Sequence, residues 1–158
     1  MLRRSRIDDH GEDGAAGARL LIVNDDEGGC ELVARILEGA GFETTRIHSH
    51  ADAVLALNKP GQDIDAVVID FTSGGASSSL KLLDSVRHGV ERNRDIPALI
   101  LANSANNRLF AYQTGADAFL VRPFHANDLI AEVRVALGRS VEARDKHREL
   151  MLHDEQSA

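Results

Sequence analysis

Short apolar runs alternate along this chain with stretches whose apolar residues recur at helical spacing. Most of the runs are continuously apolar, which is typical of strands that helices cover on both faces. The predicted strands are residues 19–23, 42–47, 66–69, 98–101 and 118–121. The second run differs, because polar residues alternate through it, and this favours a strand at the edge of the sheet.

Helical spacing recurs between these runs. Leu32, Val33, Ile36 and Leu37 form one apolar stripe, and the glycines after it end the helix. Similar stretches are predicted at 51–55, 83–90, 109–113 and 129–137. Strands and helices that alternate with short turns predict an α/β fold, a doubly wound parallel sheet of five strands with helices on both faces.

Three segments are predicted from these patterns. Residues 1–17 mix arginines with acidic residues without any period and are expected to form a disordered tail. Residues 18–138 hold all the predicted strands and form the globular domain. Residues 139–158 are highly charged and predict a polar helix or a frayed extension. The default interpretation of its basic set is a solvated face; an anionic ligand is the alternative. The set is Arg139, Arg144, Lys146 and Arg148.

Composition narrows the class of protein. The chain has 158 residues, a net charge of −7 and one Cys, so no intramolecular disulfide can form. No apolar run approaches the roughly 20 residues that span a bilayer, and no signal-like stretch follows the basic start. Few aromatic residues and an acidic balance argue against direct nucleic-acid binding. We expect a cytoplasmic domain without membrane association.

Candidate chemistry lies where the strands end, because an open parallel sheet binds ligands outside its carboxyl edge. Acidic residues follow two predicted strands, at 24–27 and at 70–74, and Arg122 follows the last one. Like charges gathered in this way call for a cation that offsets them. Oxygen ligands suit Mg²⁺, which would leave one carboxylate able to attack an activated phosphoryl group.

Three other interpretations are weaker. A phosphohydrolase of the D-x-D-x-T type lacks its second Asp, because Phe71 and Thr72 follow Asp70. A nucleotide cradle lacks the G-x-G-x-x-G pattern after the first strand. The only histidines at a spacing that resembles metal ligands are His48 and His50, which is little support for zinc.

The pieces LLIVNDDE…ELVARILEGAGF, DAVVIDF, IPALIL and TGADAFLVRPF, in this order and spacing, resemble the receiver domain of bacterial two-component response regulators. The resemblance covers about residues 18–138 and implies the flavodoxin-like strand order 2-1-3-4-5. It also implies that Asp70 is the phosphoacceptor. The implied Mg²⁺ ligands are Asp70, Asp25, Asn24 at the neighbouring acidic position, and the backbone carbonyl of Thr72.

The chain departs from the family pattern around the site. Ala102 stands where the family has a Thr or Ser that contacts the phosphoryl group, and Ser104 could supply a hydroxyl only if the strand slipped. Arg122 stands in place of the usual Lys before a cis-Pro, and the aromatic switch residue falls on Phe119. The loop after Asp70 is also rich in Gly and Ser. The resemblance is therefore to an atypical member. The residues implied to accept the phosphoryl group are intact, whereas the residues implied to respond to it, the readout half of the site, are altered.

Two functions follow from the resemblance. The favoured one is a single-domain response regulator, not an enzyme, which accepts a phosphoryl group from a sensor histidine kinase or histidine phosphotransfer protein. It would signal to an unknown protein target, and homodimer formation is left open. The alternative is an adaptor that binds a partner without phosphorylation, through its last two helices and strand 118–121. Asn24, Asp25 and Asp70 favour the first function, and Ala102 and Arg122 favour the second.

Overall fold

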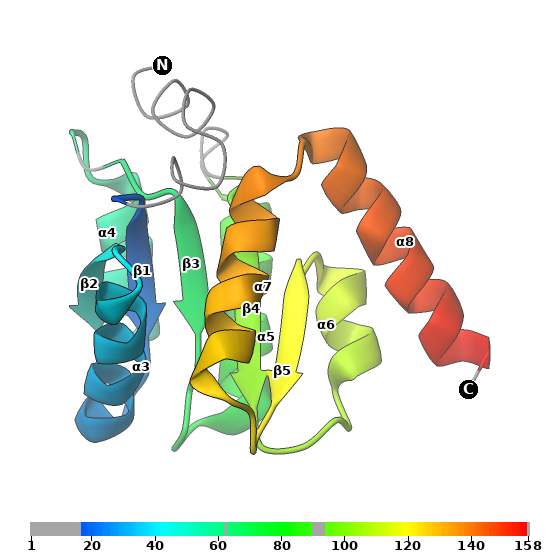
Figure 1. The fold of residues 1–158 in the computed structure, drawn as a ribbon, viewed down its shortest axis with the longest axis horizontal. Coiled ribbons are helices and arrows are strands. Elements are labelled where there is room, and N and C mark those ends of the chain that lie inside the picture. The colour runs from blue at the N-terminus through cyan, green and yellow to red at the C-terminus, as the bar shows by residue number, and fades with distance from the viewer. Residues whose placement is uncertain (1–16, 62, 90–93, 158) are drawn as a thin grey trace.

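Five parallel strands form one sheet in the order β2-β1-β3-β4-β5 in a computed structural model of the chain (Figure 1). The structure describes residues 17–61, 63–89 and 94–157. The strands are β1 (Arg19–Val23), β2 (Glu43–Ile47), β3 (Ala66–Ile69), β4 (Ala98–Ala102) and β5 (Ala118–Val121). All five predicted strands are therefore confirmed, and β2 lies at one edge as its alternation predicted.

Helices cover both faces of this sheet. Before the C-terminal segment they are α3 (Glu27–Gly39), α4 (His50–Asn58), α5 (Gly75–Arg87), α6 (Arg108–Thr114) and α7 (Ala126–Gly138). Leu20 and Ile22 of β1 point into a core formed with α3 and α7. Leu21 and Val23 point into a second core with α4, α5 and α6. This alternation explains why residues 20–23 of the strand are all apolar, because each of them meets one layer or the other.

The predicted helix at 83–90 ends earlier than expected among the described residues. Helix α5 ends at Arg87, and His88 caps it through its backbone N–H. Val90, which was included in the predicted stripe, lies outside the described residues, as do residues 1–16 of the predicted disordered tail. Of the tail, Gly17 is described, and its N–H donates to the carbonyl of Gly41 at 2.7 Å.

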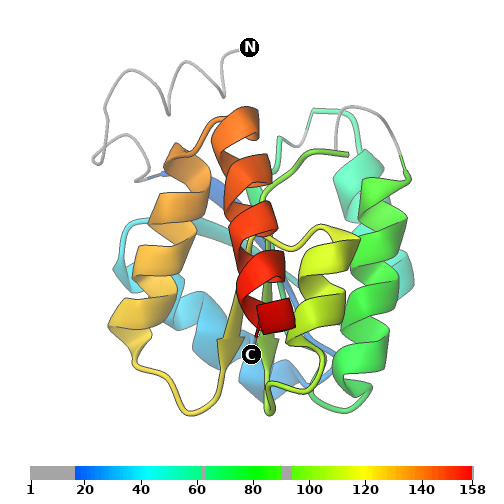
Figure 2. The same ribbon diagram turned by 90° about the vertical axis from the view of Figure 1, so that its right-hand side faces the viewer.

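A further helix, α8 (Val141–Ser157), follows α7 after a short connection. Seen from the β5 side, α8 runs between α6 and α7 and lies over β5, the second edge of the sheet (Figure 2). Met151 and Leu152 of α8 pack against the core on the α6 side. The helix thus covers an edge strand, whose unpaired backbone groups would otherwise face solvent.

The expectation of a solvated basic face on this segment is wrong for two of its four residues. Arg144 is buried, with 5 % of its surface exposed, and Arg148 is half-buried with it. Both form ion pairs with the buried Asp117. Arginine tolerates such a position because its fork of N–H donors can satisfy a carboxylate directly.

Candidate functional site

Three strand ends meet at the carboxyl edge of the sheet and bring the predicted acidic clusters together. The strand ladders continue into the residues that follow, which fixes their places. The N–H of Asn24 donates to Ile47 O at 3.0 Å, and that of Asp70 donates to Val23 O at 2.8 Å. The N–H of Arg122 donates to Ala102 O at 2.9 Å. The structure thus brings Asn24, Asp70 and Arg122 to the same edge of the sheet.

Asn24 is fully buried and ties the two acidic loops to each other. Its amide nitrogen Nδ2 donates to Thr72 Oγ1 at 3.0 Å and to Asp70 Oδ2 at 3.3 Å. Its Oδ1 accepts the N–H groups of Asp26 at 2.9 Å and Thr72 at 3.1 Å. Two acceptor sites on this oxygen are therefore used, so Asn24 acts here as a brace between loops.

Asp25 and Asp26 hold backbone groups around the site. The Asp25 carboxylate accepts the N–H of Ser73 at 2.9 Å and of Gly74 at 2.7 Å, which fixes the start of the loop after β3. Asp26 caps α3 by accepting the N–H of Gly29 at 2.7 Å. A Cβ on Gly29 would lie 2.7 Å from Asn24 Nδ2, so only glycine lets the start of α3 approach this closely.

Asp70 has 2 % of its surface exposed and forms an ion pair with Arg122 through Oδ2. Burial raises the pKa of the Asp70 carboxyl, the Arg122 guanidinium opposes the rise, and the charges of Asp25 and Asp26 add to it. Both hydrogen bonds described for Asp70 end on Oδ2. Within the described residues, Oδ1 is therefore the oxygen without a hydrogen bond and the one available for reaction.

The predicted readout residues are Ala102, Ser104 and Phe119. The register pairs Ala102 with Val121, so β4 has not slipped and Ala102 ends the strand. Ser104 is exposed in the following loop, where its hydroxyl accepts the N–H of Asn106 at 3.1 Å. Phe119 is buried with its ring 5.6 Å from the Arg108 guanidinium. No contact between these side chains and Asp70 is described, so their switch roles stay predictions.

The carboxylates at this edge of the sheet suit a divalent cation. Three carboxylates, those of Asp25, Asp26 and Asp70, influence one another here and face a single guanidinium, which leaves a surplus of negative charge. Among the described residues, no three His, Cys, Asp or Glu side chains form a metal-binding group. Mg²⁺ needs only one or two carboxylates, together with carbonyl oxygens and waters. The residues present fit such an ion, with Asp70 and Asp25 as its carboxylates.

Sequence reasoning missed two supports of the site. His48 follows β2, and its Nδ1 lies 3.0 Å from Asn24 O. Ser79 of α5 is buried, and its hydroxyl accepts the N–H of Phe71 at 3.4 Å. Ser79 is a polar residue at an inward position of α5, and this exception among apolar residues could have indicated a structural role. No sequence pattern distinguishes His48 in the same way.

The fold and the site define a class of domain. A five-stranded parallel sheet of this order carries a buried Asp at the end of β3, an acidic loop after β1 and a cation before a cis-Pro after β5. This combination is that of a receiver domain.

Comparison with known proteins agrees with this class, although no family model matches the chain. The phosphate regulon transcriptional regulatory protein PhoB of Escherichia coli (strain K12) is 28 % identical over 123 residues, which cover 77 % of this chain and 52 % of PhoB. The HemR receiver domain from Leptospira biflexa matches with a TM-score of 0.63 at 26 % identity, covering 78 % of this chain and 96 % of that one. Chemotaxis response regulator CheY4 of Vibrio cholerae matches with a TM-score of 0.66 at 21 % identity, covering 77 % and 99 %.

The chain is therefore similar, in sequence and in fold, to the receiver domains of two-component response regulators. It spans about half the length of PhoB and of the other curated relatives that it matches. In the part of the chain that the structure describes, no helix is long and apolar enough to cross a membrane.

Proposed function

We propose that this domain accepts a phosphoryl group on Asp70 from a histidine kinase or a histidine phosphotransfer protein, and signals through protein–protein contacts in the cytoplasm. One observation supports this most directly. A buried carboxylate with one oxygen without a hydrogen bond among the described residues lies at the joint end of β1, β3 and β5, beside a guanidinium. The domain is an acceptor in this proposal and does not turn over a substrate as an enzyme.

The transfer forms one bond and breaks another. Oδ1 of Asp70 attacks the phosphorus, and the bond between phosphorus and the donor's imidazole nitrogen breaks, with its electron pair going to that nitrogen. Asn24 holds Oδ2 of Asp70 and thereby orients the carboxylate. Arg122 remains near the acceptor and can exchange its ion pair with Asp70 for phosphoryl oxygens, which its fork of donors suits.

Mg²⁺ is the cofactor in this proposal, held by Asp70 and Asp25 with the Thr72 carbonyl. When bound it would offset the negative charge that develops during phosphoryl transfer. Asp25 then has two tasks, because it also accepts the N–H groups of Ser73 and Gly74. Through these two hydrogen bonds Asp25 holds the loop after β3 at the site when no ion is bound.

The central experiment is intact-mass analysis after incubation with acetyl phosphate and MgCl₂. We expect one added, acid-labile phosphoryl group on the wild type and none on Asp70→Asn. Asp84→Asn is the matched control, because Asp84 is an exposed aspartate on α5 and should leave modification unchanged. A wild type that stays unmodified with acetyl phosphate and with kinases would leave the adaptor function as the better explanation.

The metal assignment has its own test. Asp25→Asn removes the carboxylate charge and keeps one of the two acceptor oxygens, so one of the two loop hydrogen bonds should persist while Mg²⁺ binding and phosphorylation are lost. Isothermal titration with MgCl₂ measures the binding, and amide shifts of Ser73 and Gly74 report the loop. Phosphorylation of Asp25→Asn at the wild-type rate, or of the wild type without divalent ion, would contradict the assignment.

A further inference from the structure

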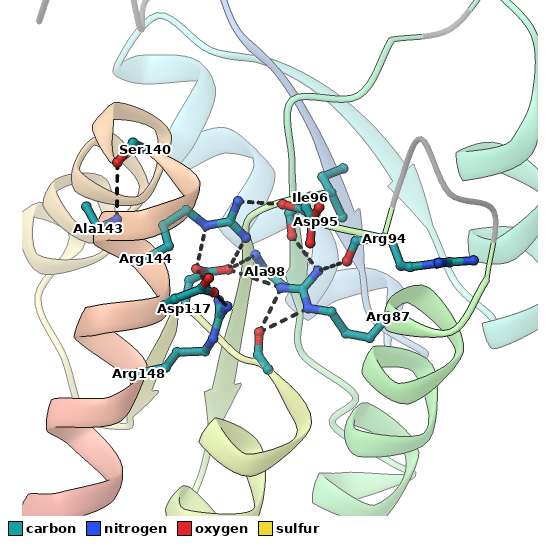
Figure 3. Close-up of polar contacts among 12 residues, drawn as sticks. Arg87, Arg94, Asp95, Ile96, Ala98, Asp117, Ser140, Ala143, Arg144 and Arg148 are labelled. Carbon is teal, nitrogen blue, oxygen red and sulfur yellow. Dashed lines mark hydrogen bonds and ion pairs between the residues drawn. The ribbon is translucent and has the colours of Figure 1, made fainter.

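A second buried aspartate lies at the opposite end of the sheet, directly before β5. Asp117 has 1 % of its surface exposed and accepts hydrogen bonds from three arginines on two helices (Figure 3). Arg144 of α8 reaches both oxygens, with Nε 2.7 Å from Oδ1 and Nη2 3.0 Å from Oδ2. Arg148 of α8 donates to Oδ1 at 3.1 Å. We call Asp117, Arg144 and Arg148 the Asp117 latch.

The domain's own half of this cluster is supported without α8. Asp117 Oδ2 accepts the N–H of Ala98 at 2.8 Å and Arg87 Nη2 at 3.2 Å. Arg87 also donates to Gly115 O at 2.7 Å and Ile96 O at 2.6 Å. Gly115 has φ of 111°, and a Cβ there would meet Arg87, so glycine keeps this guanidinium in place. A carboxylate aimed at the position of α8 is therefore built into the core.

The face that α8 turns to the domain is mainly polar. Its inward positions recur at helical spacing and are Arg144, His147, Arg148, Met151 and Leu152. His147 meets the buried Tyr112 ring edge-on at 6.3 Å between centroids. The two apolar residues are only partly buried, and Leu150 is 59 % exposed. Little apolar surface holds the helix in place, so the ion pairs decide whether it stays.

The connection to α7 allows α8 to move as a unit. Helix α7 ends at Gly138, and α8 begins at Val141, where Ser140 caps it by accepting the N–H of Ala143 at 3.1 Å. Arg139 between them is extended, with φ of −86° and ψ of 141°. Helix α8 thus carries its own cap, and rotation about two residues would detach it without unfolding either helix.

We propose that the face of α6 and β5 around Asp117 is a docking surface for a partner protein's helix that carries two arginines one turn apart, and that α8 is an internal copy of this ligand that keeps the surface closed. Charge complementarity identifies the occupant, because a buried carboxylate at the centre selects guanidinium groups. The inference does not depend on phosphorylation of Asp70. It also places α8 on the strand through which the predicted adaptor would bind.

A partner helix competes with α8, which is tethered and present at high effective concentration. It gains by placing larger apolar residues where Met151 and Leu152 are only partly buried. The measured affinity of any such helix is reduced by the fraction of molecules in which α8 is docked. Loosening α8 should therefore tighten binding in trans.

The test uses the full chain and a fluorescent peptide of residues 139–158 as the probe. Fluorescence anisotropy should show that the Arg144→Gln/Arg148→Gln variant binds this peptide at least about tenfold more tightly than the wild type does, since the surface is then open for most of the time. A peptide carrying the same two glutamines should bind neither protein. Hydrogen exchange should show α8 unprotected in the variant while β5 stays protected.

Arg139→Gln/Lys146→Gln is the matched control, because it removes the same charge from α8 and the connection before it, outside the latch, and should bind like the wild type. Adding Asp117→Asn to the latch variant should abolish peptide binding, and urea unfolding verifies that this protein is folded. Equal peptide binding by wild type and latch variant, or binding that survives Asp117→Asn, would overturn the proposal. So would self-association of the latch variant in light scattering, which would assign the surface to a second copy.

Discussion

Asp70 and Asp117 are both nearly inaccessible aspartates, and they lie at opposite ends of the same parallel sheet. Asp70 follows β3 and pairs with one arginine, with two further carboxylates nearby. Asp117 precedes β5 and pairs with three arginines. The first environment has a surplus of negative charge, and the second has a surplus of positive charge.

This difference shows what each buried carboxylate is suited to do. The two hydrogen bonds described for Asp70 use one of its oxygens, which leaves the other to react. Asp117 receives five donors across both oxygens, so it has no capacity left for chemistry but holds three elements together. The cost of crowding guanidinium groups is visible at Arg87, where burial first, and then Arg144 and Arg148, lower the pKa to about 10 although Asp117 opposes this.

The largest change in the free energy of unfolding is expected when the charge of Asp117 is removed. Asp117→Asn leaves Arg87 and Arg144 buried without a counter-charge, and breaking a buried pair in this way costs about 3 kcal/mol of unfolding free energy. Urea unfolding measures the loss. Asp145→Asn is the control, because Asp145 pairs with Arg148 at the surface and should change stability little. Similar losses from the two variants would show that the cluster is not the structural centre that its burial suggests.

The second effect concerns the readout half of the Asp70 site. Ala102→Thr adds a hydroxyl at the end of β4, and a hydrogen bond to a charged phosphoryl group contributes about 1.5–3 kcal/mol. Phosphorylation can shift a conformational equilibrium only by its differential affinity for the two states, so the wild type should respond weakly and the variant more strongly. Amide shifts of residues 102–124 with and without a phosphoryl mimic measure the response. Large shifts in the wild type that Ala102→Thr does not increase would show that another group supplies this contact.

Most of the fold could be predicted from the sequence, because its strands are apolar on both faces and its helices carry apolar stripes. The position of Asp70 was predictable for the same reason, since it follows an apolar run directly. The brace formed by Asn24 was not, because three of its four hydrogen bonds join it to Asp70 and Thr72, which are distant in the sequence.

The role of α8 was missed for a different physical reason. Its inward positions have helical spacing, but Arg144, His147 and Arg148 occupy three of them, so no apolar stripe appears. A search for apolar periodicity cannot find a helix that docks through ion pairs to a buried carboxylate. The signal was Asp117 itself, an acidic residue directly before an apolar strand, together with arginines one turn apart in the C-terminal segment.

Removing the charge of Asp70 should have the opposite effect on stability from removing the charge of Asp117. The pKa of Asp70 is raised by burial, so its ionised form is less favourable in the folded protein than in the unfolded one. The folded state therefore loses stability as the pH rises through this raised value, and Asp70→Asn should remove the loss. We expect the variant to be more stable at neutral pH, on the order of 1 kcal/mol. Arg122 keeps about a third of its side chain exposed and can be hydrated when its partner is neutral.

Urea unfolding of wild type and Asp70→Asn across a pH series tests this third prediction. The difference between them should be present at pH 7 and disappear in acid, where Asp70 is itself protonated and neutral. A variant less stable than the wild type at pH 7 would mean that the Arg122 ion pair outweighs the burial of Asp70. In that case the charges of Asp70 and Asp117 would both stabilise the folded protein, and the two sites would differ less than their surroundings suggest.

The smallest effect is a pH dependence at the latch. Burial chiefly lowers the pKa of His147, and Arg139 adds to this, whereas Glu132 and Asp117 oppose it; the neutral ring of Tyr112 faces the same imidazole. The folded state thus disfavours the protonated form, so docking of α8 is fully stable above the ordinary value of 6.5 and weakens as the pH falls below it. Hydrogen exchange of α8, corrected for the intrinsic rate, should show less protection at pH 5.5 than at pH 7.5. His147→Gln cannot titrate and should lose this dependence, while the Asp117 ion pairs keep α8 docked. Equal loss of protection in both proteins would place the titrating group elsewhere, and the latch would then be insensitive to pH.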